Sequence, residues 1–295
     1  SGEEGKALAA ALSQATWAAD SDQAEEIRKL FGTPSEKYQL NAPPPPLRNH
    51  PLLDLASDQR KALDTEVRRG LKRFKRLKQP GLDASRAEHW EPLKRLPSAQ
   101  TALTEVLARA LLGHLPEEAL EAQLAGALAA KEKPEGKKGL RVYVSACALR
   151  RMGAGALVRA SGGAVRRAAG EHQFGVAFPG GCEVVHKAIQ TWLRADSTQA
   201  ALALDSENAY LTLPRQLMLS QVRSRCDALT ATADQWYGRR TRHLYLWRDE
   251  SGRPHWGNAA EGVDPGCGLG AALVAVSTAH LNELLVQELL KTTEV

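Results

Sequence analysis

Two carboxylates near the middle of the chain have the spacing that metal-dependent chemistry uses. The apolar residues 200–204 are followed directly by Asp205 and, two residues later, by Glu207. An apolar run of this length predicts a strand buried on both faces, at whose end both side chains point to the same side. A carboxylate there is costly to desolvate unless a metal ion or a cationic side chain meets it. Asp205 is therefore a candidate metal ligand; the alternative is an acid that caps the following helix.

Basic residues are concentrated in two stretches that could contact a polyanion. The chain has 295 residues and a formal net charge of +5. Residues 60–78 hold nine Lys or Arg, and residues 141–170 hold six Arg and no acid. Such local density fits a phosphate-rich partner, although solvated helix faces are the simpler alternative.

The composition is that of an ordinary globular protein and excludes several classes. No run of eighteen apolar residues exists, so no membrane span is expected. The first residues are acidic and lack the apolar core of a secretory signal. The four cysteines are far apart and predict isolated thiols in a reducing compartment, without a zinc site. We therefore expect an intracellular protein, nuclear or cytoplasmic. Because it begins with Ser, we interpret the chain as a piece of a longer protein.

The elements that would position these residues are mostly helices, with two hairpins. Four prolines at 43–46 form a stiff spacer and predict a boundary between a helical extension over residues 1–46 and a larger domain over residues 47–295. Alternating apolar residues beside Gly-containing turns predict hairpins near residues 128–145 and 243–256. Helical periodicity predicts helices at residues 58–79, 98–113, 116–127, 147–169, 184–193, 214–225 and 269–290. The fold class expected is α+β.

Several short motifs resemble, in order and spacing, those of reverse transcriptases of the non-LTR retroelement type. Asp205 is followed by Asn208-Ala209-Tyr210, like the first catalytic motif of the polymerase palm. The other motifs are a basic hairpin from Lys133 to Arg141, Leu149-Arg150-Arg151, His172-Gln173-Phe174-Gly175 and Glu261-Gly262-Val263. The resemblance covers about residues 70–290. It implies the fingers and the first half of the palm of a right-hand polymerase fold.

The resemblance also implies roles for particular residues. Asp205 would be the catalytic carboxylate that binds Mg²⁺, together with the backbone carbonyl of Ser206. The nucleotide-binding residues would be Lys133 and Arg141 on the triphosphate, Tyr210 under the sugar, and Gly266 in a glycine-rich loop. The template-binding residues would be Arg150, Arg151, Gln173, Phe174 and Gly175. The partners would be an RNA template, a DNA primer and deoxynucleoside triphosphates. For Tyr210, a tyrosine of the core is the competing interpretation.

The chain departs from the family in ways that predict lost activity. Arg141 is followed by Val142-Tyr143 where the family has Pro-Ile, and Pro265, Cys267 and Gly268 replace the family's Gln, Asp and Pro. The sequence contains no aromatic-x-Asp-Asp motif, which supplies the other metal-binding carboxylates of the family. One carboxylate is a poor site for two Mg²⁺ ions, so weak or absent Mg²⁺ binding and no polymerisation are expected.

Two other functions fit parts of the sequence. The first is a non-catalytic basic module that binds nucleic acid through residues 60–78 and 141–170, with affinity that falls as salt rises. The second is an unrelated α/β enzyme that binds phosphate with the glycines of residues 262–270 at a helix N-terminus. No Gly-x-x-x-x-Gly-Lys-Ser/Thr run supports the second. The sequence indicates no oligomeric state.

Overall fold

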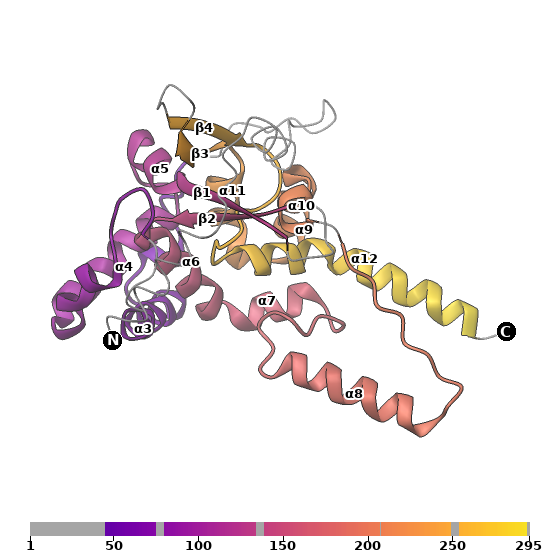
Figure 1. Ribbon diagram of the computed structural model, residues 1–295. Coiled ribbons are helices and arrows are strands. Elements are labelled where there is room, and N and C mark those ends of the chain that lie inside the picture. The colour runs from indigo at the N-terminus through magenta and orange to yellow at the C-terminus, as the bar shows by residue number, and fades with distance from the viewer. Residues whose placement is uncertain (1–44, 75–79, 134–138, 207, 249–253, 294–295) are drawn as a thin grey trace.

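The chain folds as a mixed α+β structure in which helices surround a small four-stranded sheet (Figure 1). The computed structural model describes residues 45–74, 80–133, 139–206, 208–248 and 254–293. The predicted helical extension over residues 1–46 therefore lies outside the described residues, except for its last two. Residues 136–138, in the predicted turn of the first hairpin, and Glu207 also lie outside the described residues.

The first helices form one wall of the core. Helix α3 begins after Ser57, whose hydroxyl accepts a hydrogen bond from Arg60 N at 3.1 Å, so the start of the helix is capped. Leu63, Val67 and Leu71 recur at helical spacing and are fully buried. The elements here are η1 (Pro51–Leu53), α3 (Asp58–Arg73), η2 (Ala87–Arg95), α4 (Pro97–Leu111) and α5 (Glu117–Leu124).

Both predicted hairpins are confirmed, and they join in one sheet. Strands β1 (Gly126–Glu132) and β2 (Leu140–Ala146) pair antiparallel, as do β3 (Thr241–Arg248) and β4 (Pro254–Ala259). Strands β1 and β3 pair in parallel and connect the hairpins in the order β2-β1-β3-β4. Burial alternates along β2, so one face of this strand packs on the core.

The predicted helix over residues 147–169 is two helices. Helix α6 (Ala148–Ala160) ends at Ser161, and α7 (Gly162–Ala169) begins directly after it. Ser161 has non-helical dihedral angles, and the two glycines that follow it favour an interruption because glycine lowers helix propensity. Helices α10 (Arg215–Arg225), α11 (Asp227–Tyr237) and α12 (Gly270–Thr293) complete the main core with α3, α4 and α6.

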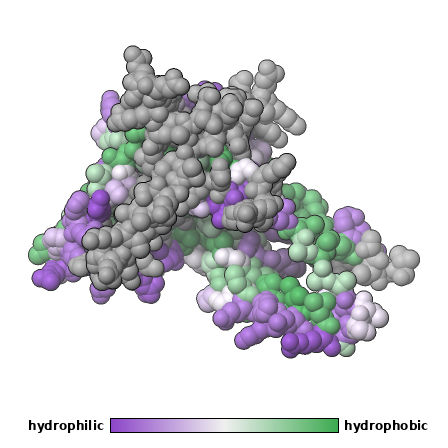
Figure 2. All heavy atoms as spheres, in the orientation of Figure 1, coloured by the Kyte–Doolittle hydropathy of each residue, from purple (hydrophilic) through white to green (hydrophobic). Residues whose placement is uncertain are grey.

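Helix α8 (Gly181–Ala195) and the C-terminal part of α12 extend away from this body (Figure 1). Figure 2 shows hydrophobic side chains gathered along both of them. The exposed apolar residues are Val184, Ile189, Trp192 and Leu193 on α8, and Leu281, Leu284, Leu285 and Leu289 on α12. These helices therefore carry apolar side chains that the described residues leave in contact with solvent.

The predicted buried strand at residues 200–204 is wrong. The described residues 196–206, between α8 and α9 (Ala209–Thr212), form no helix or strand, and Leu202 and Leu204 are 86% and 75% exposed. A strand is fixed by hydrogen bonds to a neighbouring strand, and none of the four described strands pairs with this segment. Apolar composition alone, without a partner strand, did not bury it.

A buried ion pair lies where α6, the sheet and the loop before α12 meet. The side chains of Arg150, Asp264 and His243 are at most 1% exposed. Arg150 Nη2 donates to Asp264 Oδ2 at 2.6 Å, and His243 Nε2 lies 2.9 Å from Asp264 Oδ1. Arg150 Nη1 also donates to Leu124 O at 2.8 Å. Burial alone would raise the pKa of Asp264, but His243 and Arg150 more than offset it and hold that pKa well below its usual range.

A second buried arginine completes this charge cluster. Arg215 donates from Nε to Gly262 O at 2.9 Å and from Nη1 to Arg239 O at 2.7 Å. Burial lowers the pKa of Arg215, and the nearby Asp264 charge opposes that effect. Both guanidinium groups lie over the Tyr237 ring, at 5.9 Å for Arg150 and 5.2 Å for Arg215. We call Arg150, Arg215, His243 and Asp264 the buried charge cluster.

Asp264→Asn should destabilise the protein by about 3–5 kcal/mol, because it leaves two buried arginines without their carboxylate. Asp205→Asn is the matched control, since it makes the same chemical change at an exposed carboxylate and should alter stability by less than about 0.5 kcal/mol. Urea unfolding followed by circular dichroism measures both. Equal stabilities of the two variants would contradict the role given to the cluster.

The cluster also predicts how stability depends on pH. Because the folded-state pKa of Asp264 is lowered, its contribution is fully present above the unfolded value of about 4 and is lost as the pH falls through the folded value. The wild-type free energy of unfolding should therefore fall more steeply below about pH 4 than that of Asp264→Asn. Urea titrations at several acidic pH values test this, and parallel curves would contradict it.

Candidate functional site

A hollow of about 370 Å³ opens between the β1–β2 hairpin, the segment before α9 and the loop before α12. We call it the Asp205 pocket. Its lining residues are Lys133, Leu140, Arg141, Val142, Asp205, Ser206, Asn208, Ala209, Tyr210, Leu211 and Pro265. Five of the predicted site residues thus meet in one place, although they come from two separate parts of the chain. These five are Lys133, Arg141, Asp205, Ser206 and Tyr210.

The hairpin places two cations at the pocket. Lys133 directly follows β1, and its backbone N–H donates to Gly139 O at 3.0 Å, so the two arms are still paired there. Arg141 lies near the start of β2 between the buried Leu140 and Val142, and its own side chain is exposed. Alternation along the strand therefore presents the guanidinium to solvent while its neighbours fix the backbone in the core.

The opposite wall of the pocket is the short helix α9. Leu211 is buried and belongs to an apolar cluster with Val142 and Val144 of the sheet, which holds this helix against β2. Tyr210, the residue before Leu211 in the same helix, remains 40% exposed. The alternative that Tyr210 is a core tyrosine is therefore wrong.

The loop before α12 joins the two walls. Pro265 O accepts a hydrogen bond from Val144 N at 3.1 Å, which pairs the loop with the edge of β2. Val263 N donates to Tyr210 O at 2.6 Å, and Gly262 N donates to Leu213 O at 2.8 Å, which pairs the loop with α9 and the residue after it. The carboxylate of Asp264, between these contacts, is held in the buried charge cluster. The position of the pocket walls therefore depends on this loop, which the buried Asp264 holds in place.

The described part of the pocket offers few ligands for a metal ion. Among the described residues that line it, Asp205 is the only one with a carboxylate side chain, and Ser206 beside it offers its backbone carbonyl. No group of three or more His, Cys, Asp or Glu side chains suited to a metal occurs among the described residues. Mg²⁺ commonly binds through one or two carboxylates plus the phosphates of a substrate. The described lining residues thus supply one carboxylate, fewer than a two-ion catalytic site requires.

The predicted residue Gly266 does not line the Asp205 pocket, although its neighbour Pro265 does. Gly266 has a φ of 98°, a conformation that favours glycine, and a Cβ there would lie 3.0 Å from Val144 O. The close approach of the loop to β2 therefore explains why residue 266 is a glycine.

The template-binding prediction for Arg150 needs correction. Its guanidinium is fully buried and paired with Asp264, so it cannot touch a nucleic-acid strand in this structure. Sequence position on a basic helix did not reveal which arginine points inward. The guanidinium carbon of Arg151, the next residue, lies 5.5 Å from the centroid of the Phe74 ring.

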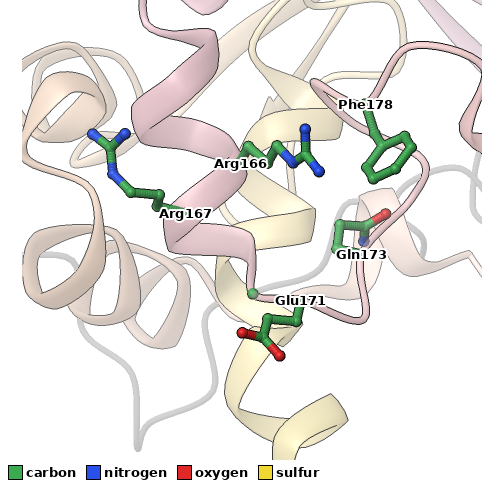
Figure 3. Close-up of a pocket in the computed structure, with 6 residues that line it drawn as sticks. Arg166, Arg167, Glu171, Gln173 and Phe178 are labelled. Carbon is green, nitrogen blue, oxygen red and sulfur yellow. The ribbon is translucent and has the colours of Figure 1, made fainter.

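The other predicted template residues lie in the loop after α7, around a second hollow. Gln173 lines this hollow of about 360 Å³ together with Arg166, Arg167, Gly170, Glu171 and Phe178 (Figure 3). Phe174 packs on Phe178 with ring centroids 5.0 Å apart, and Gly175 N donates to Gln173 Oε1 at 2.6 Å. We call this hollow the Phe178 pocket. It is lined by a different set of residues from the Asp205 pocket.

Sequence reasoning missed the buried charge cluster. Asp264 stands in the glycine-rich loop, where the sequence marks it only as a neighbour of substituted family positions, and His243 and Arg215 fall in a predicted hairpin and a predicted helix. A usable signal was present at Arg150, because it lies among apolar and small residues of a helix that must pack on the core. An arginine in such a place requires a buried acid elsewhere in the chain.

No protein-family model matches the chain, and no curated protein matches it. Among the described residues, none of the helices has the length and apolar character needed to cross a membrane.

Gly262→Ala should distort the Asp205 pocket. Gly262 has a φ of 64°, and a Cβ would overlap the backbone carbonyls of Tyr210 and Leu211. The expected loss of stability is about 2 kcal/mol or more, from the left-handed conformation together with the clash. Gly162→Ala is the control, because a Cβ there meets nothing within 4 Å at the start of α7. Thermal unfolding measures both, and an unchanged Gly262→Ala protein would show that the loop does not fix α9.

Proposed function

We propose that this chain is the fingers and first part of the palm of a reverse transcriptase of the non-LTR retroelement type. In this proposal the Asp205 pocket receives a deoxynucleoside triphosphate. The observation that carries it is the convergence of Lys133, Arg141, Asp205, Ser206 and Tyr210 in one hollow. These residues belong to two short motifs, at residues 133–141 and 205–210, which lie far apart in the sequence, and the family resemblance predicts that the two share a site. A pocket that collects them supports the resemblance more strongly than any motif does alone.

The chemistry of the pocket suits a nucleotide. Lys133 provides a compact positive charge, and Arg141 provides a planar fork that can hold two phosphate oxygens at once. Both stand on one hairpin, so a triphosphate laid across it meets two cations. The exposed Tyr210 ring on the opposite wall offers an apolar surface to a sugar. Asn208 and Pro265 complete the rim near that wall.

We propose that the described residues bind a nucleotide without polymerising it. Two-metal nucleotidyl transfer needs carboxylates that place both the attacking and the leaving oxygen. The described lining of the pocket contains one, Asp205. The proposed partners remain an RNA template, a DNA primer and deoxynucleoside triphosphates, with Mg²⁺ entering weakly and together with the phosphates.

The alternative of a purely basic binding module is less well supported. On α3, Arg60 pairs with Glu105 at 2.8 Å and Arg68 pairs with Asp64 at 2.5 Å. Glu66 pairs with Arg69 and, at 2.8 Å, with Arg159 of α6. Much of the positive charge in the described parts of the two basic stretches is therefore neutralised within the protein. On a fully solvated basic face, this positive charge would be available to a nucleic acid.

Arg141→Ala should weaken binding of a deoxynucleoside triphosphate by about tenfold to a hundredfold, because charged hydrogen bonds to phosphate are lost. Arg194→Ala on α8 is the matched control: it removes an exposed arginine that does not line the pocket. Isothermal titration calorimetry with dTTP and Mg²⁺ measures the affinities. Equal affinities of the two variants would exclude the Asp205 pocket as the triphosphate site.

Primer extension tests the second half of the proposal. With an RNA template, a DNA primer, Mg²⁺ and deoxynucleotides, neither the wild-type chain nor Asp205→Asn should extend the primer, because a second metal-binding carboxylate is lacking among the described residues of the pocket. Extension by the wild type that disappears in Asp205→Asn would contradict the incomplete site. It would mean that residues outside the described ranges complete it.

A further inference from the structure

The proline-rich segment before η1 carries a sequence pattern that the proposed function does not use. Residues 42–48 read Ala-Pro-Pro-Pro-Pro-Leu-Arg. Within this run, Pro43, Pro46 and Arg48 fit the pattern Pro-x-x-Pro-x-Arg, in which the two prolines are three residues apart. The structure describes the pattern from Pro45 onward, and its first two prolines lie outside the described residues. We call residues 43–48 the proline segment.

Consecutive prolines favour the extended polyproline II conformation. Each proline fixes its own φ at about −65°, and its ring disfavours the helical conformation in the residue before it. A polyproline II segment has about three residues per turn, so residues three apart lie along one edge and the segment has three edges. The sequence therefore predicts that Pro46, Leu47 and Arg48 lie on three different edges.

The body of the protein holds the edge on which Leu47 lies. Leu47 lines a hollow of about 370 Å³ together with His50 and residues of α11. Two side chains also contact the backbone of the segment. His114 Nε2 lies 2.7 Å from Leu47 O, and Gln235 Nε2 donates to Pro45 O at 3.4 Å. The described half of the proline segment is therefore attached to the surface through one edge.

The other two edges face solvent. Pro45, Pro46 and Arg48 are all exposed. Arg48 forms no ion pair among the described residues, whereas Arg60 and Arg68 of α3 each pair with an acid. Because prolines have little conformational freedom to lose, a partner can bind such a segment at a low entropic cost. The exposed edges thus offer a preformed apolar surface with a free positive charge at one end.

We propose that the proline segment docks a protein domain whose groove is lined with aromatic side chains, as in SH3 domains. Grooves of this kind bind Pro-x-x-Pro segments by packing aromatic rings against the prolines. An acidic side chain at one end of the groove pairs with Arg48, and this pair fixes the direction in which the segment lies. The inference is independent of the proposed function, because no residue of the proline segment lines the Asp205 pocket.

Isothermal titration calorimetry of the full chain with a purified SH3 domain that selects Pro-x-x-Pro-x-Arg ligands tests the proposal. Wild type should bind, and Pro46→Ala and Arg48→Ala should each weaken binding by about tenfold or more, because they remove a groove contact and the ion pair. Pro51→Ala and Arg194→Ala are the matched controls. They replace an exposed proline and an exposed arginine outside the segment and should change the affinity by less than about twofold.

A wild-type chain that does not bind this domain would overturn the proposal. The same holds if Pro46→Ala and Arg48→Ala bind as tightly as the two controls do. All four substitutions replace exposed side chains, so the folded structure should be retained, and circular dichroism of each variant checks this.

Two further variants test which edge of the segment enters the groove. Pro43→Ala should weaken binding as Pro46→Ala does, because the three-residue period places both prolines on one edge. Leu47→Ala should change the affinity by less than about threefold, because this side chain lies against α11. An equal loss in Leu47→Ala and Pro46→Ala would overturn the assigned orientation.

A variant of the SH3 domain separates docking in the groove from general charge attraction. The chain has a formal net charge of +5, so it can attract an acidic domain without any specific contact. The domain with one aromatic residue of its groove replaced by alanine keeps its charge and loses the surface that packs on proline. Binding to it should be at least about tenfold weaker, and undiminished binding would overturn the proposal.

Discussion

The structure depends on one buried carboxylate that neutralises the interior. Asp264 accepts from Arg150 at 2.6 Å and lies 2.9 Å from His243 Nε2, and Arg215 stands close enough to lower its pKa further. A charge without a partner in the same place would be prohibitively costly to desolvate. The arginines therefore require the acid, and the acid requires that the loop before α12 enter the core between β3, α6 and α10.

The loop that places Asp264 in the core also positions elements at the surface. The loop that delivers Asp264 inward also pairs with β2 through Pro265 and with α9 through Val263. The exposed Tyr210 and the hairpin cation Arg141 face one hollow because the same loop holds both of their elements. A site made of short surface segments is in this way positioned by a rigid interior, which is the arrangement that precise binding needs.

The sequence allowed much of the framework to be predicted, and the reasons for the failures are physical. The hairpins and most helices followed from local periodicity and from turn residues such as Gly139. The buried strand predicted at residues 200–204 was wrong because a strand is buried only when it pairs with a neighbouring strand that can be distant in the sequence. The template-binding role predicted for Arg150 was wrong because an arginine at this position can lie on a solvated face or in a buried ion pair. Only the position of Asp264, far along the chain, decides between the two. The gathering of Lys133, Arg141, Asp205 and Tyr210 could be anticipated from the order of the motifs, but their geometry could not.

The parallel pairing of β1 with β3 has a consequence for the order of folding. Gly126 pairs with His243, and Arg150 meets Asp264 across a separation of 114 residues. The first hairpin and α6 can form as soon as they leave the ribosome, because their contacts are local. Arg150 must then stay hydrated until the ribosome has produced Asp264, so the interior closes only after that residue has been synthesised. Until β3 has been produced, β1 presents an unpaired edge, and such an edge can associate with another chain during translation.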